Sequence, residues 1–403
     1  MGSEVVNLGS ICTQVQYGYT DTADTSNLNG IGFVRGTDIS TNDIIWDAVP
    51  SCLPNDEKFK KYSLEVDDIL ITRMGSIGTS AIVKEVPRPS VFASYLIRFK
   101  VDKTKANPLY ISYVLKSTLF TDYVNGANSS GVQPNINAKT LSAFEFPLPD
   151  RPTQDRVAAL LNDFESAAFN NRKIGKLLSK SMDALFLTMC TNLPLTNIEL
   201  RDTGITIESG SRPKGGVAGI TEGVPSIGAE SIAGIGVYDY SKTKFVPEEF
   251  FNKMRKGIPQ DFDVLLYKDG GKPGEFKPRL GMFGLGFPFS DYAINEHVFL
   301  LRSEQLGQPF LYFWLNQEKV LDVLRNAGIK AAIPGINQQD VNRLIVEVPE
   351  AKVIDAFNDK AMPVLEEILR LAGESRVLLQ LRDSYLKRFI IELVSPPAEM
   401  IAS

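Results

Sequence analysis

The single histidine of the 403-residue sequence, His297, has the widest chemical repertoire, because an imidazole can act as general base, nucleophile or metal ligand near neutral pH. It lies between Glu296 and the apolar run Val298–Leu301, which has the character of a strand. No Ser/His/Asp or Cys/His constellation can be assembled around it, so a structural role is favoured. The sequence also lacks a G-x-x-x-x-G-K-S/T loop and a G-x-G-x-x-G turn between strand and helix. The sequence therefore carries none of the usual signatures of histidine catalysis, nucleotide hydrolysis or dinucleotide binding.

A tetrapeptide, Asn107-Pro108-Leu109-Tyr110, is similar to the catalytic tetrapeptide of DNA adenine methyltransferases. It carries Leu where those enzymes carry a second Pro. The Gly284-Leu285-Gly286 segment could be mistaken for their cofactor loop, but it has no clear strand-to-helix context. A helix N-terminus and a loop are the favoured interpretations, and a single-chain methyltransferase is an alternative.

A second enzymatic alternative is a nuclease that depends on Mg²⁺. Asp263, followed twelve residues later by Glu275-Phe276-Lys277, has the spacing of a site whose carboxylates hold the metal while the lysine assists a water. Pro273-Gly274 disfavours the strand that should carry Glu275. The first half of the chain has a counterpart of Asp263, Asp68, with no Glu-x-Lys after it. The pattern therefore favours a structural aspartate.

In both halves of the chain, small polar or basic residues beside glycines indicate a binding surface more clearly than the patterns above indicate catalysis. Such groups donate hydrogen bonds to phosphates and base edges, and the glycines let backbone approach a ligand closely. Solvated turn chemistry is the alternative for each residue taken singly. The predicted DNA-contacting residues are Thr37, Ser76, Thr79, Ser129, Ser130, Gln133 and Asn135 in the first half, and Ser211, Arg212, Lys214, Lys268, Lys272, Lys277, Arg279 and Lys330 in the second.

The elements that would position these residues occur twice. Leu8 with Gly18 recurs at an offset of 192 as Leu200 with Gly210, and Gly36-Thr37-Asp38 recurs as Gly228-Ala229-Glu230. Further pairs are Asp68-Ile69-Leu70 with Asp263-Val264-Leu265, and Pro134–Asn137 with Pro334–Asn337. Strands are expected over parts of 65–77, 95–99, 264–267 and 298–301, and helices over 109–120 and 309–324. A repeat of this size predicts two similar globular units doing one job twice.

Each half runs into a long apolar stripe of helical spacing. Leu161, Phe164, Ala168, Ile174 and Leu178 begin the first, and about 36 helical residues would span ~54 Å. The second includes apolar residues from Leu365 to Phe389, and Pro363, just before Leu365, should start a helix or kink one. Two such stripes at matched positions predict an antiparallel pair. The alternative is that each helix merely covers its own domain.

Composition is that of a globular protein, with 43% apolar residues and no apolar run near the ~20 residues that span a bilayer. The segment Met1–Glu4 lacks secretory features, so a cytoplasmic location without membrane attachment is expected. Cys12, Cys52 and Cys190 have no metal spacing and are expected to be buried thiols. Residues 1–150 hold 13 basic and 16 acidic side chains, so nucleic-acid binding would require basic residues gathered on one face or contacts from a partner.

Four features resemble the DNA specificity subunit of type I restriction-modification enzymes: the repeated Leu followed ten residues later by Gly, the Gly75–Gly78 turn, the Gly131–Ile136 loop, and the Pro147–Pro149 exit into a helix that opens with Gln154. The second half departs from the family pattern at Ile333–Ile336 and at Glu350-Ala351-Lys352. The resemblance implies a mixed α+β protein: two repeated α/β target recognition domains joined by two long antiparallel helices that form a coiled coil. Its parts would be a first recognition domain (1–150), a central helix (151–190), a second recognition domain (191–349) and a C-terminal helix (350–395).

The resemblance also implies a subunit that reads DNA and has no catalytic site of its own. Each domain would read one half of a split, asymmetric site in double-stranded DNA, with an unread spacer between the halves. The helices would dock two methyltransferase (modification) subunits, and restriction (motor-nuclease) subunits would join for cleavage. No cofactor is expected on this chain, because S-adenosylmethionine, ATP and Mg²⁺ would be held by those partners. A coiled-coil scaffold that binds no DNA is the non-enzymatic alternative.

Overall fold

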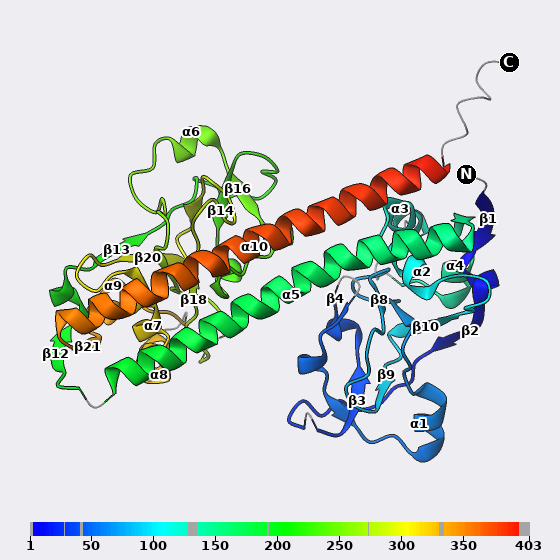
Figure 1. The fold of residues 1–403 in the computed structure, drawn as a ribbon, viewed down its shortest axis with the longest axis horizontal. Helices are drawn as coiled ribbons and strands as arrows, with labels where there is room; N and C mark the ends of the chain where they lie inside the picture. Colours follow the sequence, from blue (N-terminus) through cyan, green and yellow to red (C-terminus); the bar gives the residue numbers. More distant parts are fainter. Residues whose placement is uncertain are drawn as a thin grey trace. The chain divides into compact units, whose positions relative to one another are not determined.

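A computed structural model describes residues 3–27, 29–40, 43–127, 135–191, 193–272, 274–329 and 334–394. The chain forms two compact units, each with a globular part of mixed helix and strand (Figure 1). The first unit comprises Met1–Ser166 and Leu379–Ser403, and the second comprises Ala167–Leu378. Both long helices, α5 (Arg151–Cys190) and α10 (Ala351–Val394), contribute residues to both units.

The first unit is built on an antiparallel sheet whose central strands are buried on both faces. Its order is β2 (Cys12–Tyr17), β10 (Leu96–Val101), β7 (Asp68–Thr72) and β8 (Ser80–Ile82). Side chains alternate across a strand, so Ile69 and Ile71 pack into one apolar cluster while Leu70 packs into another. A smaller sheet has the order β6 (Ser51–Cys52), β3 (Ile31–Val34) and β9 (Ser90–Phe92), and its strands β3 and β9 are parallel. It packs against the face of the main sheet that carries Leu70.

Helices cover the other face of the sheet, where Ile69 and Ile71 lie. Asn107 and Asn137 cap α2 and α4 by accepting hydrogen bonds from backbone N–H groups of the first turn. Strand β1 (Ser3–Asn7) pairs with β11 (Glu145–Pro149), which leads into α5. The remaining elements of this unit are α1 (Asp56–Tyr62), α2 (Pro108–Val114), α3 (Thr118–Ala127), α4 (Ala138–Ser142), β4 (Ile39–Ser40) and β5 (Asp43–Ile44).

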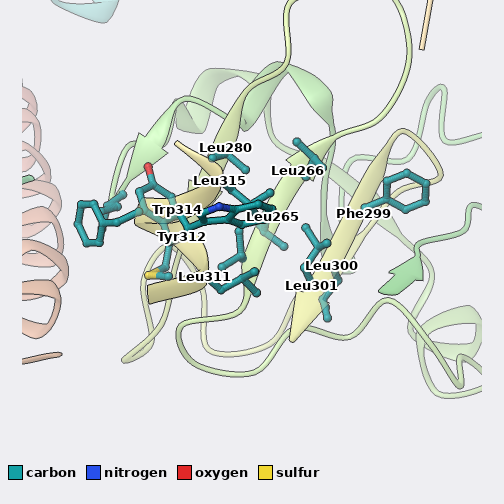
Figure 2. Close-up of a cluster of buried hydrophobic side chains, with 14 of the residues drawn as sticks. Leu265, Leu266, Leu280, Phe299, Leu300, Leu301, Leu311, Tyr312, Trp314 and Leu315 are labelled. Atoms are coloured by element: carbon teal, nitrogen blue, oxygen red, sulfur yellow. The ribbon is translucent and has the colours of Figure 1, made fainter. Parts of the chain in front are cut away.

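The second unit repeats this plan. Its main sheet has the order β13 (Thr206–Ser209), β20 (Val298–Arg302), β17 (Val264–Tyr267), β18 (Leu280–Met282) and β15 (Gly234–Ile235). The smaller sheet is β16 (Lys244–Val246), β14 (Val224–Ile227) and β19 (Ala293–Ile294), again with one parallel pair. The other elements are α6 (Glu248–Phe251), α7 (Gln308–Leu315), α8 (Glu318–Gly328), α9 (Gln338–Asn342), β12 (Thr196–Glu199) and β21 (Ile345–Val348). Figure 2 shows the core, where Leu265 and Leu300 of the sheet pack near Leu311 and Trp314 of α7.

The repeated Asp-Ile/Val-Leu motif starts the central strand in each unit. Asp67 and Phe262 precede it with φ values of 76° and 67°. The aspartates Asp68 and Asp263 then accept hydrogen bonds from the backbone N–H groups three residues earlier. Each carboxylate is also paired with an arginine of the neighbouring strand, Arg98 at 3.3 Å and Arg302 at 2.5 Å. The motif therefore holds a tight turn and a buried ion pair in place.

Two expectations about helices were wrong in detail. The stretches 109–120 and 309–324 each form two helices, α2 with α3 and α7 with α8, because polar residues turn the chain between them. At the second break Asn316 is the C-cap of α7, and its side-chain amide donates to Asp183 of α5 over 3.0 Å. Helix α10 contains Pro363 in its interior, so of the two alternatives for that residue the helix start is excluded.

The two long helices pack together in opposite directions, as their paired residues within the second unit show (Figure 1). The Ser375 hydroxyl donates to the Ala168 carbonyl oxygen over 3.2 Å, whereas seven residues further along α5 Gly175 lies against Ile368. Small residues on α5 thus let α10 approach closely. Within the described ranges, no helix combines the length and apolar character needed to span a membrane.

A buried carboxylate on α5, Glu165, ties the helices to the globular part of the first unit. Its oxygens lie 2.8 Å from the charged nitrogens of Lys84, Lys116 and Arg382, and it accepts a hydrogen bond from Tyr113 at 3.1 Å. Lys116 and Arg382 have side chains only 6% and 11% exposed. Because these cations come from three different parts of the chain, one carboxylate neutralises charges that would otherwise be buried unpaired.

We predict that Glu165→Ala lowers the free energy of unfolding by about 3–5 kcal/mol, because Lys116 and Arg382 would lose the carboxylate that compensates their burial. Urea unfolding of the full-length chain measures the effect. The control is Glu392→Ala, which removes an exposed carboxylate of the same helix pair, the partner of Arg388. Equal stabilities for the two variants would contradict the importance of the buried cluster.

A second prediction concerns how the stability of the fold depends on acidic pH. Burial alone would raise the pKa of Glu165, but attraction to Lys116 and Lys84 outweighs it and lowers the pKa from 4.5 to about 2. A carboxyl whose folded pKa is depressed stabilises the fold fully above its unfolded pKa and loses that contribution as pH falls toward the folded value. The difference in unfolding free energy between the wild type and Glu165→Gln should therefore be constant above about pH 5 and shrink between pH 4.5 and 2. A difference that stays unchanged down to pH 2 would refute this assignment.

Candidate nucleic-acid interface

A glycine turn follows the central strand β7 in the first unit and brings its loop to the surface. Gly75 and Gly78 have φ values of 76° and 79°, which a side chain would strain. The turn is closed by Gly78 N–H donating to the Thr72 carbonyl oxygen over 3.0 Å and by Thr72 N–H donating to that of Thr79 over 2.9 Å. The predicted residue Ser76 is exposed at the tip, and Thr79 is half-buried at the end of the turn.

Two further segments meet this turn. Arg73 donates its backbone N–H to the Tyr95 carbonyl oxygen over 2.9 Å, and its own carbonyl oxygen accepts from Ile136 N–H over 3.0 Å. The Arg73 guanidinium donates to the Asn135 side chain over 3.2 Å and lies 5.0 Å from the ring centre of Tyr17. The predicted residue Asn135 is therefore adjacent to the turn that holds Ser76.

A pocket of about 680 Å³ opens beside the turn, within the first unit. It brings together two of the predicted residues, Thr37 and Ser76, and adds Ser94 and Tyr95, which follow β9. The side chain of Tyr95 is 55% exposed. The pocket is lined by Tyr19, Thr20, Asp21, Ala23, Phe33, Arg35, Gly36, Thr37, Met74, Gly75, Ser76, Ala93, Ser94 and Tyr95. Hydroxyl groups and aromatic rings of this kind can donate to, accept from and stack on nucleotide bases.

Arg35 is held at the pocket by a buried carboxylate. Its Nε and one terminal nitrogen donate to the two oxygens of Asp38 over 3.0 and 2.8 Å, while 30% of its side chain stays exposed. This hydrogen bonding raises the pKa of Arg35, which keeps the guanidinium charged. The arrangement presents a cation of fixed orientation, which suits a phosphate or a base acceptor.

The second unit builds the same loop junction with different side chains. Lys268 N–H donates to the His297 carbonyl oxygen over 2.9 Å, and the Lys268 carbonyl oxygen accepts from Ile336 N–H over 2.8 Å. These are the hydrogen bonds that Arg73 makes with Tyr95 and Ile136 in the first unit, so Lys268 corresponds to Arg73 and His297 to Tyr95. Gly270 and Gly271 follow with φ values of 124° and 108°.

Charged side chains surround this second junction. His297 Nδ1 contacts Asp269, and its Nε2 lies 3.4 Å from Glu296. The Arg212 Nε lies 2.6 Å from the same Glu296 oxygen, and the Lys268 ammonium lies 3.7 Å from Asp269. Of the predicted residues, Arg212 and Lys268 therefore come together here. His297 has a side chain 42% exposed and belongs to this charged surface.

The other predicted residues lie in several places. Ser211 and Lys214 are exposed on the loop after β13, and Lys272 is exposed after the glycine pair. Lys277 is paired with Glu275 at 2.6 Å, and Arg279 lies 4.6 Å from the ring centre of Tyr267 and donates to the Ala229 carbonyl oxygen. The predictions for Ser129, Ser130, Gln133 and Lys330 fall outside the described residues.

Sequence reasoning missed the segment after the second strand of each parallel pair. Ser94 and Tyr95 in the first unit, and Glu296 and His297 in the second, reach the surface beside the glycine turns. The available signal was positional, because Ser94–Tyr95 lies at the start of the predicted strand 95–99 and Glu296–His297 directly precedes the predicted strand 298–301. The two pairs share no residue type, so the repeat is invisible at these positions until backbone hydrogen bonds align them.

The residues that suggested enzymatic chemistry have structural partners instead. The Asn107 side chain caps α2, as the helix N-terminus interpretation predicted. Asp263 is bound to Arg302, and Glu275 lies outside the strands and pairs with Lys277. Among the described residues, no group of three or more His, Cys, Asp or Glu side chains could hold a metal ion.

Comparison with known proteins agrees with a repeated recognition module on a helix pair. Residues 2–179 match the family model described as the type I restriction modification DNA specificity domain. The MjaIX specificity subunit of a type I restriction enzyme from Methanocaldococcus jannaschii is 19% identical over 343 residues, which are 80% of this chain and 76% of that protein. The putative MjaX specificity subunit of the same organism is 28% identical over 141 residues, 34% of this chain and 33% of that protein.

The fold has a solved counterpart. The S subunit of a type I restriction-modification system from M. genitalium matches with a TM-score of 0.54 at 14% identity, over 97% of this chain and 96% of that chain. The likeness covers both globular parts and the two long helices, so it concerns the fold of nearly the whole chain. Residues 2–179 thus carry a type I restriction modification DNA specificity domain, and the chain is similar over 80% of its length to a specificity subunit.

The repeated glycines Gly18 and Gly210 generate a prediction about both loop junctions. A Cβ at Gly18 would overlap the Ala93 carbonyl group, and one at Gly210 would overlap that of Ile294. We expect Gly18→Ala and Gly210→Ala each to destabilise its own unit by more than ~1 kcal/mol, because backbone atoms must shift. Thermal unfolding measures this. Gly126→Ala in α3, where a Cβ meets nothing within 4 Å, is the control and should leave stability unchanged or raised. Equal effects of the three changes would contradict the role of close backbone approach.

Proposed function

We propose that the chain is the DNA-reading subunit of a type I restriction-modification enzyme, and that each globular part reads one half of a bipartite, asymmetric site. The observation that carries this proposal is the loop junction built twice from the same backbone hydrogen bonds but lined by different side chains. Two surfaces of the same geometry would read two different short sequences. Near-neutral charge in each half fits a reader of base edges that shares phosphate contacts with partners.

The helix pair would dock the catalytic partners. Large apolar side chains remain exposed on both helices, among them Phe169 and Leu177 of α5, which are 50% and 56% exposed, and Val377 of α10, which is 53% exposed. Exposed apolar residues along a packed helix pair are typical of a surface that a partner covers. We propose two methyltransferase subunits as those partners, with restriction subunits joining them. S-adenosylmethionine, ATP and Mg²⁺ would be bound by these partners, and none by this chain.

The proposal is tested by exchanging one recognition domain. Replacing residues 1–150 with the matching region of another family member should change one half of the methylated sequence and leave the other half and the spacer intact, because each unit has its own core. Mapping methylated adenines in cells that express the hybrid with its methyltransferase measures both halves at once. The matched experiment replaces residues 191–349 and should change the opposite half.

Two outcomes would contradict this assignment. A hybrid that alters both halves equally would mean that the two globular parts do not read DNA independently. Methylation or cleavage of DNA by the purified chain alone, with S-adenosylmethionine or Mg²⁺ supplied, would make it an enzyme. Absence of sequence-specific binding even with the methyltransferase present would instead support a scaffold without a DNA-reading role.

A further inference from the structure

The pocket of the first unit is assembled from the segments that follow four strands. These segments contain Tyr19–Asp21 after β2, Arg35–Thr37 after β3, Met74–Ser76 after β7 and Ala93–Tyr95 after β9. Backbone hydrogen bonds join them, since Ala93 N–H donates to the Val34 carbonyl oxygen and Ser94 N–H donates to that of Tyr19, each over 2.9 Å. The side chains of the pocket are therefore presented on a frame that main-chain contacts hold.

Among the described residues that line this pocket, Arg35 is the only cation. Its Nε and Nη2 donate to the carboxylate of Asp38, which is 2% exposed. The other terminal nitrogen, Nη1, has no hydrogen-bond partner within the part of the chain that the structure describes. The end of the planar guanidinium, where Nη1 and Nη2 each direct one N–H outward, is thus left free. Arg35 therefore offers a fork of two donors whose orientation Asp38 fixes.

The second unit shows that the fold does not require this ion pair. The residue before the 3-10 helix that follows β3 is Arg35, and the residue before the matching 3-10 helix after β14 is Gly228. The last residue of that helix is Asp38 in the first unit and Ser231 in the second. At Gly228 a Cβ would lie only 2.5 Å from a carboxylate oxygen of Glu230. The same frame is therefore built without the arginine and without the aspartate.

The surroundings of the fork favour a base over a phosphate as its ligand. The pocket lining adds a carboxylate, Asp21, so with Asp38 the acids outnumber Arg35, whereas proteins bind phosphates with a surplus of positive charge. The rings of Tyr19 and Phe33, with centroids 5.6 Å apart, add apolar walls. A neutral ligand with two adjacent acceptors fits this setting. Guanine presents such a pair, O6 and N7, on its major-groove edge, and arginine binds both atoms at once.

We propose that Arg35 reads a guanine of the first half-site, with Nη1 and Nη2 donating to its O6 and N7 while Asp38 holds the guanidinium in place. This inference rests on the proposed function and adds one base pair of the site together with the residue that selects it. Gly228, at the matching position of the second unit, has no side chain that could donate. The second half-site is therefore selected by other residues.

The test uses the complex of this chain with its methyltransferase and a pool of randomised DNA duplexes, from which bound sequences are recovered and read. The wild type should select a G·C pair in the half-site that residues 1–150 determine. Arg35→Met, which keeps a long side chain but has no donor, should lower the preference for that pair about tenfold and leave the second half-site unchanged. The control is Arg325→Met, which breaks another arginine–aspartate pair of residues three apart, on α8, and should alter neither half-site.

A modified base tests the contact at one atom without changing the protein. In 7-deazaguanine a C–H group replaces N7, and the base still pairs with cytosine. The wild-type complex should bind the selected duplex about tenfold more weakly when this base replaces the guanine, because one charged hydrogen bond is lost. Fluorescence anisotropy of labelled duplexes measures the affinity. The Arg35→Met complex should bind both duplexes equally.

Folding is checked separately, because Arg35→Met leaves the buried carboxylate of Asp38 without its cation. Thermal unfolding of the variant identifies any loss of structure. The double variant Arg35→Met/Asp38→Asn removes both charges, and it should show the same loss of preference for guanine.

The outcomes are distinguishable. A selected first half-site that lacks a G·C pair, that folded Arg35→Met reads unchanged, or at which the wild type tolerates 7-deazaguanine at every guanine overturns this inference alone. Arg35→Met binding all duplexes more weakly by the same factor, with a salt dependence reduced by about one ion, would assign Arg35 to a phosphate and overturns it as well. Absence of any selected sequence for the wild type overturns the proposed function and this inference with it.

Discussion

The burial of Glu165 among three cations is the constraint on which the first unit depends. Lys116 follows α2, Lys84 follows β8 and Arg382 lies on α10, so a single carboxylate of α5 fixes the positions of three other segments. One apolar cluster of the first unit contains Val157 and Leu161 of α5, Phe389 of α10 and residues of the central strand β7. The strand β7, which leads into the pocket turn, therefore packs against helices whose positions are fixed by this buried ion-pair cluster.

In the second unit an amide replaces the lysine at the matching position of the helix junction. The residue that matches Lys116 at the repeat offset of 200 is Asn316, which donates to Asp183 of α5. A neutral amide needs no counter-charge when it is buried. The neighbouring contacts of this junction are apolar, among Phe186, Phe310 and Phe357. A duplicated fold therefore keeps its backbone while its buried polar partners differ.

Because the backbone is held independently of many side chains, the surfaces of the two loop junctions can differ. The loop junctions are held by main-chain hydrogen bonds of Arg73 and Lys268 and by glycines at close approaches, none of which depends on the side chains that line the surface. Residues such as Tyr95 and His297 can then vary with little cost to the fold. The proposed reading of two different half-sites would use this property, because variable side chains would be presented on a constant backbone.

The sequence by itself determined the repeat, the central strands and the two long helices, because periodic apolar residues and turn glycines are local signals. It also placed Thr37 and Ser76, which the structure brings to one pocket. Only the tertiary structure decided that Ser94 and Tyr95 share that pocket, since hydrogen bonds between segments far apart in the chain align them. It likewise decided that Lys277 is paired with Glu275 and that Pro363 lies inside a continuous helix. Partner choice and the burial of flanking residues are properties of three-dimensional packing, which local spacing does not encode.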